Sequence, residues 1–198
     1  MAATVSAEIS LLATADLAEF VQSTGSTGDH GKLNDIINYV SMRFENETGR
    51  KLKSRDYTEV YDGNGANALY LNNYPIASTD ITITIDAARA FDDTGDEVTA
   101  TDVMLTTENG LVRLDDDTFS AGRGNVQVEY TAGYSTASEF ALTFAAKELG
   151  SLMWQRMRQK EAIGVRTESF EGHSVTYEND LPWSVKKVLD IYRDRRFA

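Results

Sequence analysis

The chain has 198 residues, of which 41% are hydrophobic and 25% are charged, so it can bury one substantial core or two smaller ones. It contains no cysteine, which excludes disulfides, thiolate metal sites and a thiol nucleophile. The net charge of -12 is uneven, since residues 1–130 carry 9 Lys and Arg against 22 Asp and Glu, whereas residues 131–198 carry 10 against 9. The acidic part repels a phosphate backbone, which argues against tight nucleic-acid binding.

Two helices are predicted in the N-terminal segment. Thr14 is expected to cap a short helix that ends near Gln22. A second helix is predicted from Asp29 to a stop at Gly49, because apolar residues recur at helical spacing and form one stripe: Leu33, Ile36, Ile37, Val40 and Phe44.

Neither a signal peptide nor a membrane span is expected. The N-terminus lacks the basic flank of a signal peptide, and no apolar run in the chain approaches the roughly 20 residues that cross a bilayer.

Between Arg55 and Gly133 the apolar period changes to two, which predicts strands. Asn109 and Gly110 stand between two short apolar runs and predict a hairpin turn in which both take positive φ. The region is expected to be a mostly antiparallel sheet with polar loops at residues 87–101 and 115–125. Its alternating positions are Tyr57, Glu59 and Tyr61, then Ile81, Ile83 and Ile85, which should face a core, and finally Val126, Val128 and Tyr130.

The C-terminal third returns to helical spacing. A long helix is predicted from Ser138, with a broad apolar face made of Phe140, Leu142, Phe144, Ala145, Leu149, Leu152, Met153 and Met157. Residues 164–179 are predicted to be a polar, partly extended segment. Pro182 then opens a final helix whose apolar side carries Val185, Val188, Leu189 and Tyr192.

Together these elements predict an α+β fold. Its helical base, residues 1–50 and 136–198, contains the N-terminal helices, the long C-terminal helix and the final helix. The mostly antiparallel β region, residues 55–133, is inserted between the two helical segments. A single domain of residues 1–198 is expected, because the two flanking helical segments need each other to bury their apolar stripes.

No motif for catalysis, a metal or a cofactor is recognised in the sequence. His30 and His173 are the only histidines, and neither belongs to a ligand set or a catalytic triad spacing. The acidic stretches at residues 92–97 and 115–117 lack the alternating spacing of a calcium loop. We therefore expect no catalytic residue, no metal site and no cofactor, and a protein that is not an enzyme.

Several segments, in this order, resemble the head-tail connector (adaptor) proteins of tailed bacteriophages. After an early short helix come ENETGR at residues 45–50, YTEVYDGNGANALYLNNYPI at 57–76, VQVEYTAGYSTASEFALTFAAKELGSLMW at 126–154 and IGVRTESFEGHSVTYENDLPWSVKKVLDIYR at 163–193. The last two are the more specific, because composition does not predict a YTAGY turn that leads into a long helix. The chain departs from the family in its acidic loop at residues 87–101, which is longer than a minimal connector needs.

The resemblance implies a structural virion protein of the neck, at the head-tail junction, assembled in the host cytoplasm. Connectors form a ring of about twelve copies beneath the portal protein and present a platform to a stopper or tail-completion protein. Genomic DNA passes through the ring without sequence-specific binding, and no membrane is involved. The candidate portal-interface residues are Lys186, Lys187, Arg193, Arg195, Arg196 and Phe197. The candidate residues of a lumen-lining or rearranging loop are Glu168, Phe170, Glu171 and His173.

Other interpretations stay open at this point. The basic C-terminal residues could be a frayed, solvated helix end, and residues 164–179 could merely link two helices. A different class of function is a soluble acidic module that binds a small ligand or a carbohydrate. In that case Tyr57, Tyr61, Tyr70 and Tyr74 would be exposed on the sheet as a stacking surface.

Overall fold

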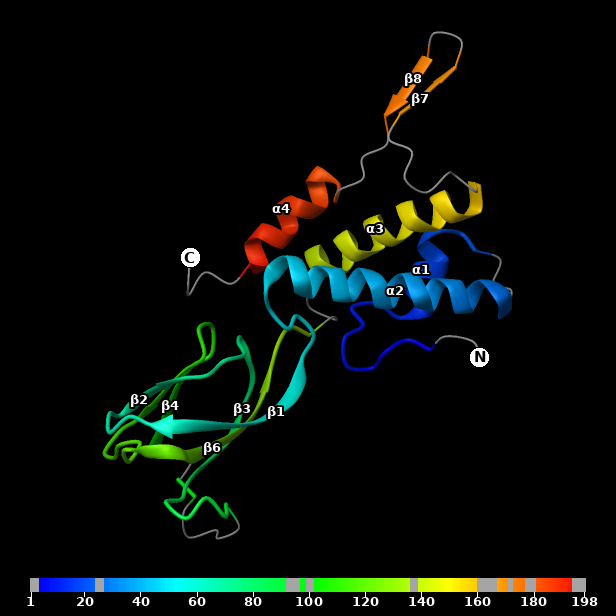
Figure 1. The fold of residues 1–198 in the computed structure, drawn as a ribbon. Coiled ribbons are helices and arrows are strands. Elements are labelled where there is room, and N and C mark those ends of the chain that lie inside the picture. The colour runs from blue at the N-terminus through cyan, green and yellow to red at the C-terminus, as the bar shows by residue number, and fades with distance from the viewer. Residues whose placement is uncertain are drawn as a thin grey trace. The chain divides into compact units, whose positions relative to one another are not determined.

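The computed structural model describes residues 4–23, 27–91, 97–98, 102–135, 139–159, 167–170, 173–176 and 181–193. These residues form an α+β fold with four helices, two three-stranded antiparallel sheets and a two-stranded antiparallel pair, and this confirms the predicted fold class (Figure 1). The chain divides into two compact units. Residues 1–52 and 136–198 belong to the helical unit, and residues 53–135 belong to the β unit.

The helical unit contains α1 (Thr14–Phe20), α2 (Thr27–Thr48), α3 (Phe140–Gln159) and α4 (Trp183–Tyr192). The predicted apolar stripe of α2 is confirmed, since all five of its residues are buried. Gly49 ends α2 with a φ of +69°, a conformation that glycine adopts without steric cost. Thr14 does not cap α1: the N-cap is Ala13, and the Thr14 hydroxyl lies 2.6 Å from the side-chain oxygen of Asn34, to which it donates.

The face that α3 buries differs from the one predicted. Leu142, Ala145 and Leu149 are buried as expected, and Trp154 joins them. Phe140, Phe144 and Met157 are instead exposed. The apolar pattern of α3 extends over more of the helix surface than its neighbours α1, α2 and α4 cover.

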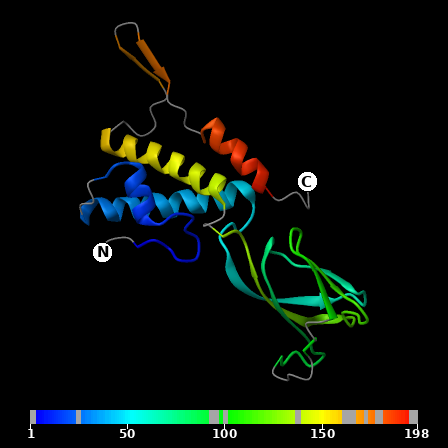
Figure 2. The same ribbon diagram turned by 180° about the vertical axis from the view of Figure 1, so that it is seen from behind.

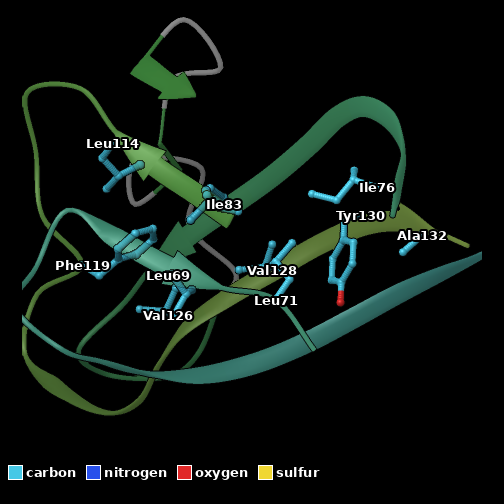
Figure 3. Close-up of a cluster of buried hydrophobic side chains, with 11 residues drawn as sticks. Leu69, Leu71, Ile76, Ile83, Leu114, Phe119, Val126, Val128, Tyr130 and Ala132 are labelled. Carbon is cyan, nitrogen blue, oxygen red and sulfur yellow. The ribbon is translucent and has the colours of Figure 1, made fainter. Parts of the chain in front are cut away.

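The β unit consists of two sheets. In one sheet, β6 (Gly122–Ala132) lies between β1 (Arg55–Gly63) and β3 (Ile76–Ile85). In the other, β5 (Leu111–Leu114) lies between β2 (Ala68–Tyr70) and β4 (Val103–Thr106). Side chains from both sheets point toward one another and form one core (Figure 3), which contains Leu69, Leu71, Ile76, Ile83, Val112, Leu114, Phe119, Val126, Val128, Tyr130 and Ala132.

Glycines shape the turns of the β unit. Gly110 has a φ of +69° in the turn between β4 and β5, whereas Asn109 does not take the positive φ predicted for it. Gly133, with a φ of +113°, ends β6 as predicted. The second polar loop is shorter than expected, because β6 already begins at Gly122. In the first polar loop, residues 92–96 and 99–101 lie outside the described residues.

The segment predicted to be partly extended contains β7 (Thr167–Phe170) and β8 (His173–Thr176). The two strands pair antiparallel, with Phe170 opposite His173.

Among the described residues, no helix combines the length and the apolarity that a bilayer crossing requires.

Candidate partner-binding surface

Helix α4 is held in the helical unit by its buried side. Val185, Leu189 and Tyr192 are buried, as the stripe predicts. The Tyr192 hydroxyl donates to a carboxylate oxygen of Glu139 at 2.8 Å. The Ser184 hydroxyl donates to Glu148 of α3 at 2.6 Å. Both ends of α4 are therefore fastened to the same neighbouring segment.

The opposite side of α4 carries a row of three residues at a spacing of four, Trp183, Lys187 and Ile191. Trp183 is 72% exposed and Ile191 is 70% exposed. The Lys187 ammonium lies 5.7 Å from the centre of the Trp183 ring, within cation-π range. Two large apolar side chains exposed on one short helix make this side of α4 a candidate partner-binding surface.

A pocket of about 250 Å³ lies beside α4 within the helical unit. Its lining combines charges of both signs with leucine side chains and consists of Glu47, Leu181, Lys186, Leu189, Asp190 and Arg193. An ion pair at its rim joins Arg193 to Asp190 at 3.7 Å. Since both side chains of this pair are about half exposed, the pair contributes little to stability and can exchange for a partner's charges.

The structure brings three of the predicted portal-interface residues together at α4. Lys186 and Arg193 line the pocket, and Lys187 lies in the outer row. The other three, Arg195, Arg196 and Phe197, lie outside the described residues. Sequence reasoning missed Trp183 and Ile191, although their spacing from Lys187 defines a second, outward face of the same helix.

The predicted lumen residues fall on the β7–β8 pair. Glu168 is in β7 opposite Val175, and Phe170 is opposite His173 of β8. Glu171 lies outside the described residues.

The tyrosine-rich surface of the alternative ligand-binding function does not form from the four predicted residues. Tyr57 and Tyr61 are half-buried and pack against the core of the β unit. Tyr57 stacks on Tyr130, with the ring centres 5.5 Å apart at an interplanar angle of 27°. Tyr70 is 58% exposed. Two of the four rings are thus engaged within the fold, and a ligand-stacking row along β1 is unavailable.

The Glu59 carboxylate of β1 is the centre of a network of side-chain hydrogen bonds in the β unit. One of its carboxylate oxygens accepts hydrogen bonds from the hydroxyls of Tyr61 and Tyr130, the latter at 2.7 Å. The other accepts from the Asn73 amide at 2.9 Å. Burial, followed by the hydrogen bond to Glu59, raises the pKa of both tyrosines above the ordinary value. The network joins β1, β6 and the segment before β3, so it is a structural feature of the β unit.

The acidic residues of the chain are concentrated in the β unit. Residues 53–135 contain 5 Lys and Arg against 15 Asp and Glu, whereas the helical unit contains 14 against 16. Within the part of the chain that the structure describes, no three acidic or histidine side chains converge as metal ligands would.

A family model described as head completion protein matches residues 10–195 of this chain. The chain belongs to the head completion protein family. This membership confirms the sequence-based classification as a structural, non-enzymatic virion protein. A sequence search of curated proteins finds no match.

Solved structures with the fold of this family member come from gene transfer agent (GTA) particles. A chain from the "neck of empty GTA particle computed with C6 symmetry" has a TM-score of 0.61 and 15% identity, over 95% of this chain and 92% of that chain. A chain from the "virion of native gene transfer agent (GTA) particle" has a TM-score of 0.61 and 16% identity, over the same shares. A chain from the "neck of native GTA particle computed with C12 symmetry" has a TM-score of 0.59 and 16% identity, over 100% and 96%.

Proposed function

We propose that this head completion protein is a head-tail connector that forms a ring in the neck of a phage-like particle. The observation that carries this proposal is the similarity in fold to chains of GTA particle necks over nearly the whole length of both chains. The C12 symmetry of one of those necks supports a ring of about twelve copies. The ring would attach to the portal protein and offer a platform to a stopper or a tail-completion protein.

Both units would act together as one connector subunit of residues 1–198, assembled in the host cytoplasm. The acidic β unit supports a passive relation to the genome, because fifteen acids against five bases disfavour adhesion to the phosphates of passing DNA. We place the β7–β8 pair, with Glu168, Phe170, Glu171 and His173, in the lumen or in a segment that rearranges during assembly.

The proposed portal contact uses the basic C-terminal residues. Lys186 and Arg193 lie at the pocket beside α4, and Lys187 follows on its outer side. Arg195, Arg196 and Phe197 continue the same basic segment. The buried side of α4 keeps Lys186 and Lys187 on a fixed helix, so a partner with acidic groups would bind these two at little cost in ordering α4.

The test is co-sedimentation of the purified chain with tail-less, DNA-filled capsids that contain the portal. The intact chain should bind in a fixed stoichiometry of several copies per capsid. A variant with Arg193→Glu, Arg195→Glu and Arg196→Glu should lose binding. A matched control with Arg89→Glu, Arg113→Glu and Arg123→Glu carries the same change in net charge on exposed residues of the β unit and should still bind.

Each result separates one part of the proposal from the others. A folded intact chain that does not bind such capsids contradicts the connector function. Loss of binding in both triple variants would show that total charge, and not the C-terminal segment, governs the contact.

A further inference from the structure

The helical unit carries an aromatic patch, formed by Phe20 of α1 and by Phe140 and Phe144 of α3. The rings of Phe20 and Phe144 meet edge to face, with their centres 6.0 Å apart at 89°. Phe140 is one helical turn before Phe144 on the same side of α3. The three side chains are 42%, 77% and 58% exposed, in chain order. Three phenylalanines gathered on the surface indicate a binding site rather than scattered apolar exposure.

The exposed charge on α1, which contributes Phe20 to the aromatic patch, is negative. Asp16 and Glu19 are exposed on α1, and Glu19 directly precedes Phe20. The row on the outer side of α4, here called the α4 row, has the opposite character. It places the Lys187 ammonium between two exposed apolar side chains, Trp183 and Ile191. The two surfaces thus match in apolarity and are opposite in charge.

Helices α1 and α4, which carry Glu19 and Lys187, lie on different sides of α3. Both lie on the helical unit, and α3 lies between α1 and α4 in both views (Figures 1 and 2). Each of α1 and α4 packs against α3. Two complementary surfaces on different sides of one chain are the arrangement that a head-to-tail contact between copies requires.

We propose that the aromatic patch of one copy binds the α4 row of the next copy. This inference rests on the proposed ring and names the surfaces that would join its subunits. The contact buries the phenylalanines against Trp183 and Ile191 and brings Lys187 close to Asp16 and Glu19 of the neighbour. It gives Lys187 a place in the subunit contact as well as in the proposed portal contact, and it leaves Lys186 and Arg193, at the pocket, to the portal.

The absence of cysteine makes disulfide cross-linking a direct test. Glu19→Cys and Lys187→Cys are introduced together into the full chain, which is oxidised at high protein concentration. A contact between patch and row in successive copies predicts a ladder of dimers, trimers and larger species on a non-reducing gel. Each single variant can give dimers at most. A further change of Phe140→Ser should reduce the ladder severalfold and leave the melting temperature unchanged, because Phe140 is 77% exposed.

The matched control pairs Lys187→Cys with Lys32→Cys, an exposed position on α2, which contributes no residue to the patch. A ladder no longer than that of this control, or one that Phe140→Ser leaves unchanged, overturns the inference.

Capsid co-sedimentation distinguishes the subunit contact from the connector function. If the intact chain binds capsids in several copies but the double-cysteine chain gives no ladder, only the subunit contact is contradicted. Failure to bind capsids contradicts the connector function itself.

Discussion

The Tyr192 hydroxyl donates a hydrogen bond of 2.8 Å to Glu139, a residue 53 positions earlier in the chain. It joins the last turn of α4 to the residue that precedes α3, and the Tyr192 backbone carbonyl also accepts from the Arg50 guanidinium at 3.2 Å. The end of α4 is therefore held by two residues that are far apart in the sequence, Arg50 and Glu139. This fixes the orientation of its outer side.

Tyr192→Phe should lower the free energy of unfolding by about 1–2 kcal/mol, because it removes a partly buried hydrogen bond to a carboxylate. Urea denaturation measures the change. Tyr39→Phe is the control, since the Tyr39 hydroxyl makes only an exposed hydrogen bond, and it should change stability by less than about 0.5 kcal/mol. Equal losses in the two variants would contradict a specific role for the contact with Glu139.

The tyrosines of the Glu59 network should make the β unit sensitive to alkali. Their pKa values are raised in the folded chain, so above about pH 10 the unfolded state loses protons that the folded state keeps. Stability is then fully present below that pH and falls as the pH rises, by up to about 1.4 kcal/mol per pH unit for each tyrosine. Urea unfolding between pH 9 and pH 11 measures this slope.

The comparison variant is Tyr61→Phe with Tyr130→Phe, which removes both titrating hydroxyls and should flatten the slope even if the chain is less stable throughout. An unchanged slope would mean that other groups cause the alkaline loss. Glu59→Gln should cost about 1–3 kcal/mol at neutral pH, because an amide cannot accept all three hydrogen bonds.

Two glycines should respond to alanine in opposite directions. At Gly133 the φ is +113°, and an added Cβ would lie 2.5 Å from the Lys53 carbonyl oxygen. Gly133→Ala should destabilise the chain by about 2–4 kcal/mol. Gly31 lies in α2 with open space around it, so Gly31→Ala should stabilise by up to about 1 kcal/mol through helix propensity. Thermal unfolding of both variants tests the two signs.

Asp86 should stabilise the backbone conformation of the loop that follows β3. Its carboxylate accepts backbone N–H groups of Phe91, Ala88 and Ala90 at 3.1, 2.7 and 2.6 Å, and these bonds hold the pKa of Asp86 below the ordinary value. Asp86→Asn should speed amide hydrogen exchange in this loop, since an amide oxygen replaces only one of the two accepting oxygens. Asp80→Asn, on the exposed surface of β3, is the control and should leave those amides unchanged.

The β7–β8 pair should not be required for capsid binding. Replacing residues 167–176 with a Gly-Ser linker removes the candidate lumen residues and leaves α3 and α4 intact. Such a chain should still co-sediment with capsids, whereas tail attachment or DNA retention should fail. Normal infectivity of particles that carry the replacement would assign residues 167–176 to a simple connection between α3 and α4.

The sequence by itself determined the local elements, because the period of apolar residues depends on backbone geometry alone. The stripe of α2, the alternation of β1 and β6, and the apolar side of α4 were all predicted. It also indicated a phage connector through the resemblance of its later segments. Tertiary structure decided which apolar residues are covered. Phe140 and Phe144 fit the pattern of a buried face, yet they are 77% and 58% exposed, because apolarity specifies what avoids water and not which element packs there.

Sequence periodicity also does not predict contacts between residues that are far apart in the sequence. The Glu59 network joins residues 14 and 71 positions apart, and the strands pair in two sheets with a shared core instead of one sheet. The outer face of α4 stays exposed because packing buries the opposite face. Sequence periodicity therefore determined the elements, and packing decided which of their faces stay exposed.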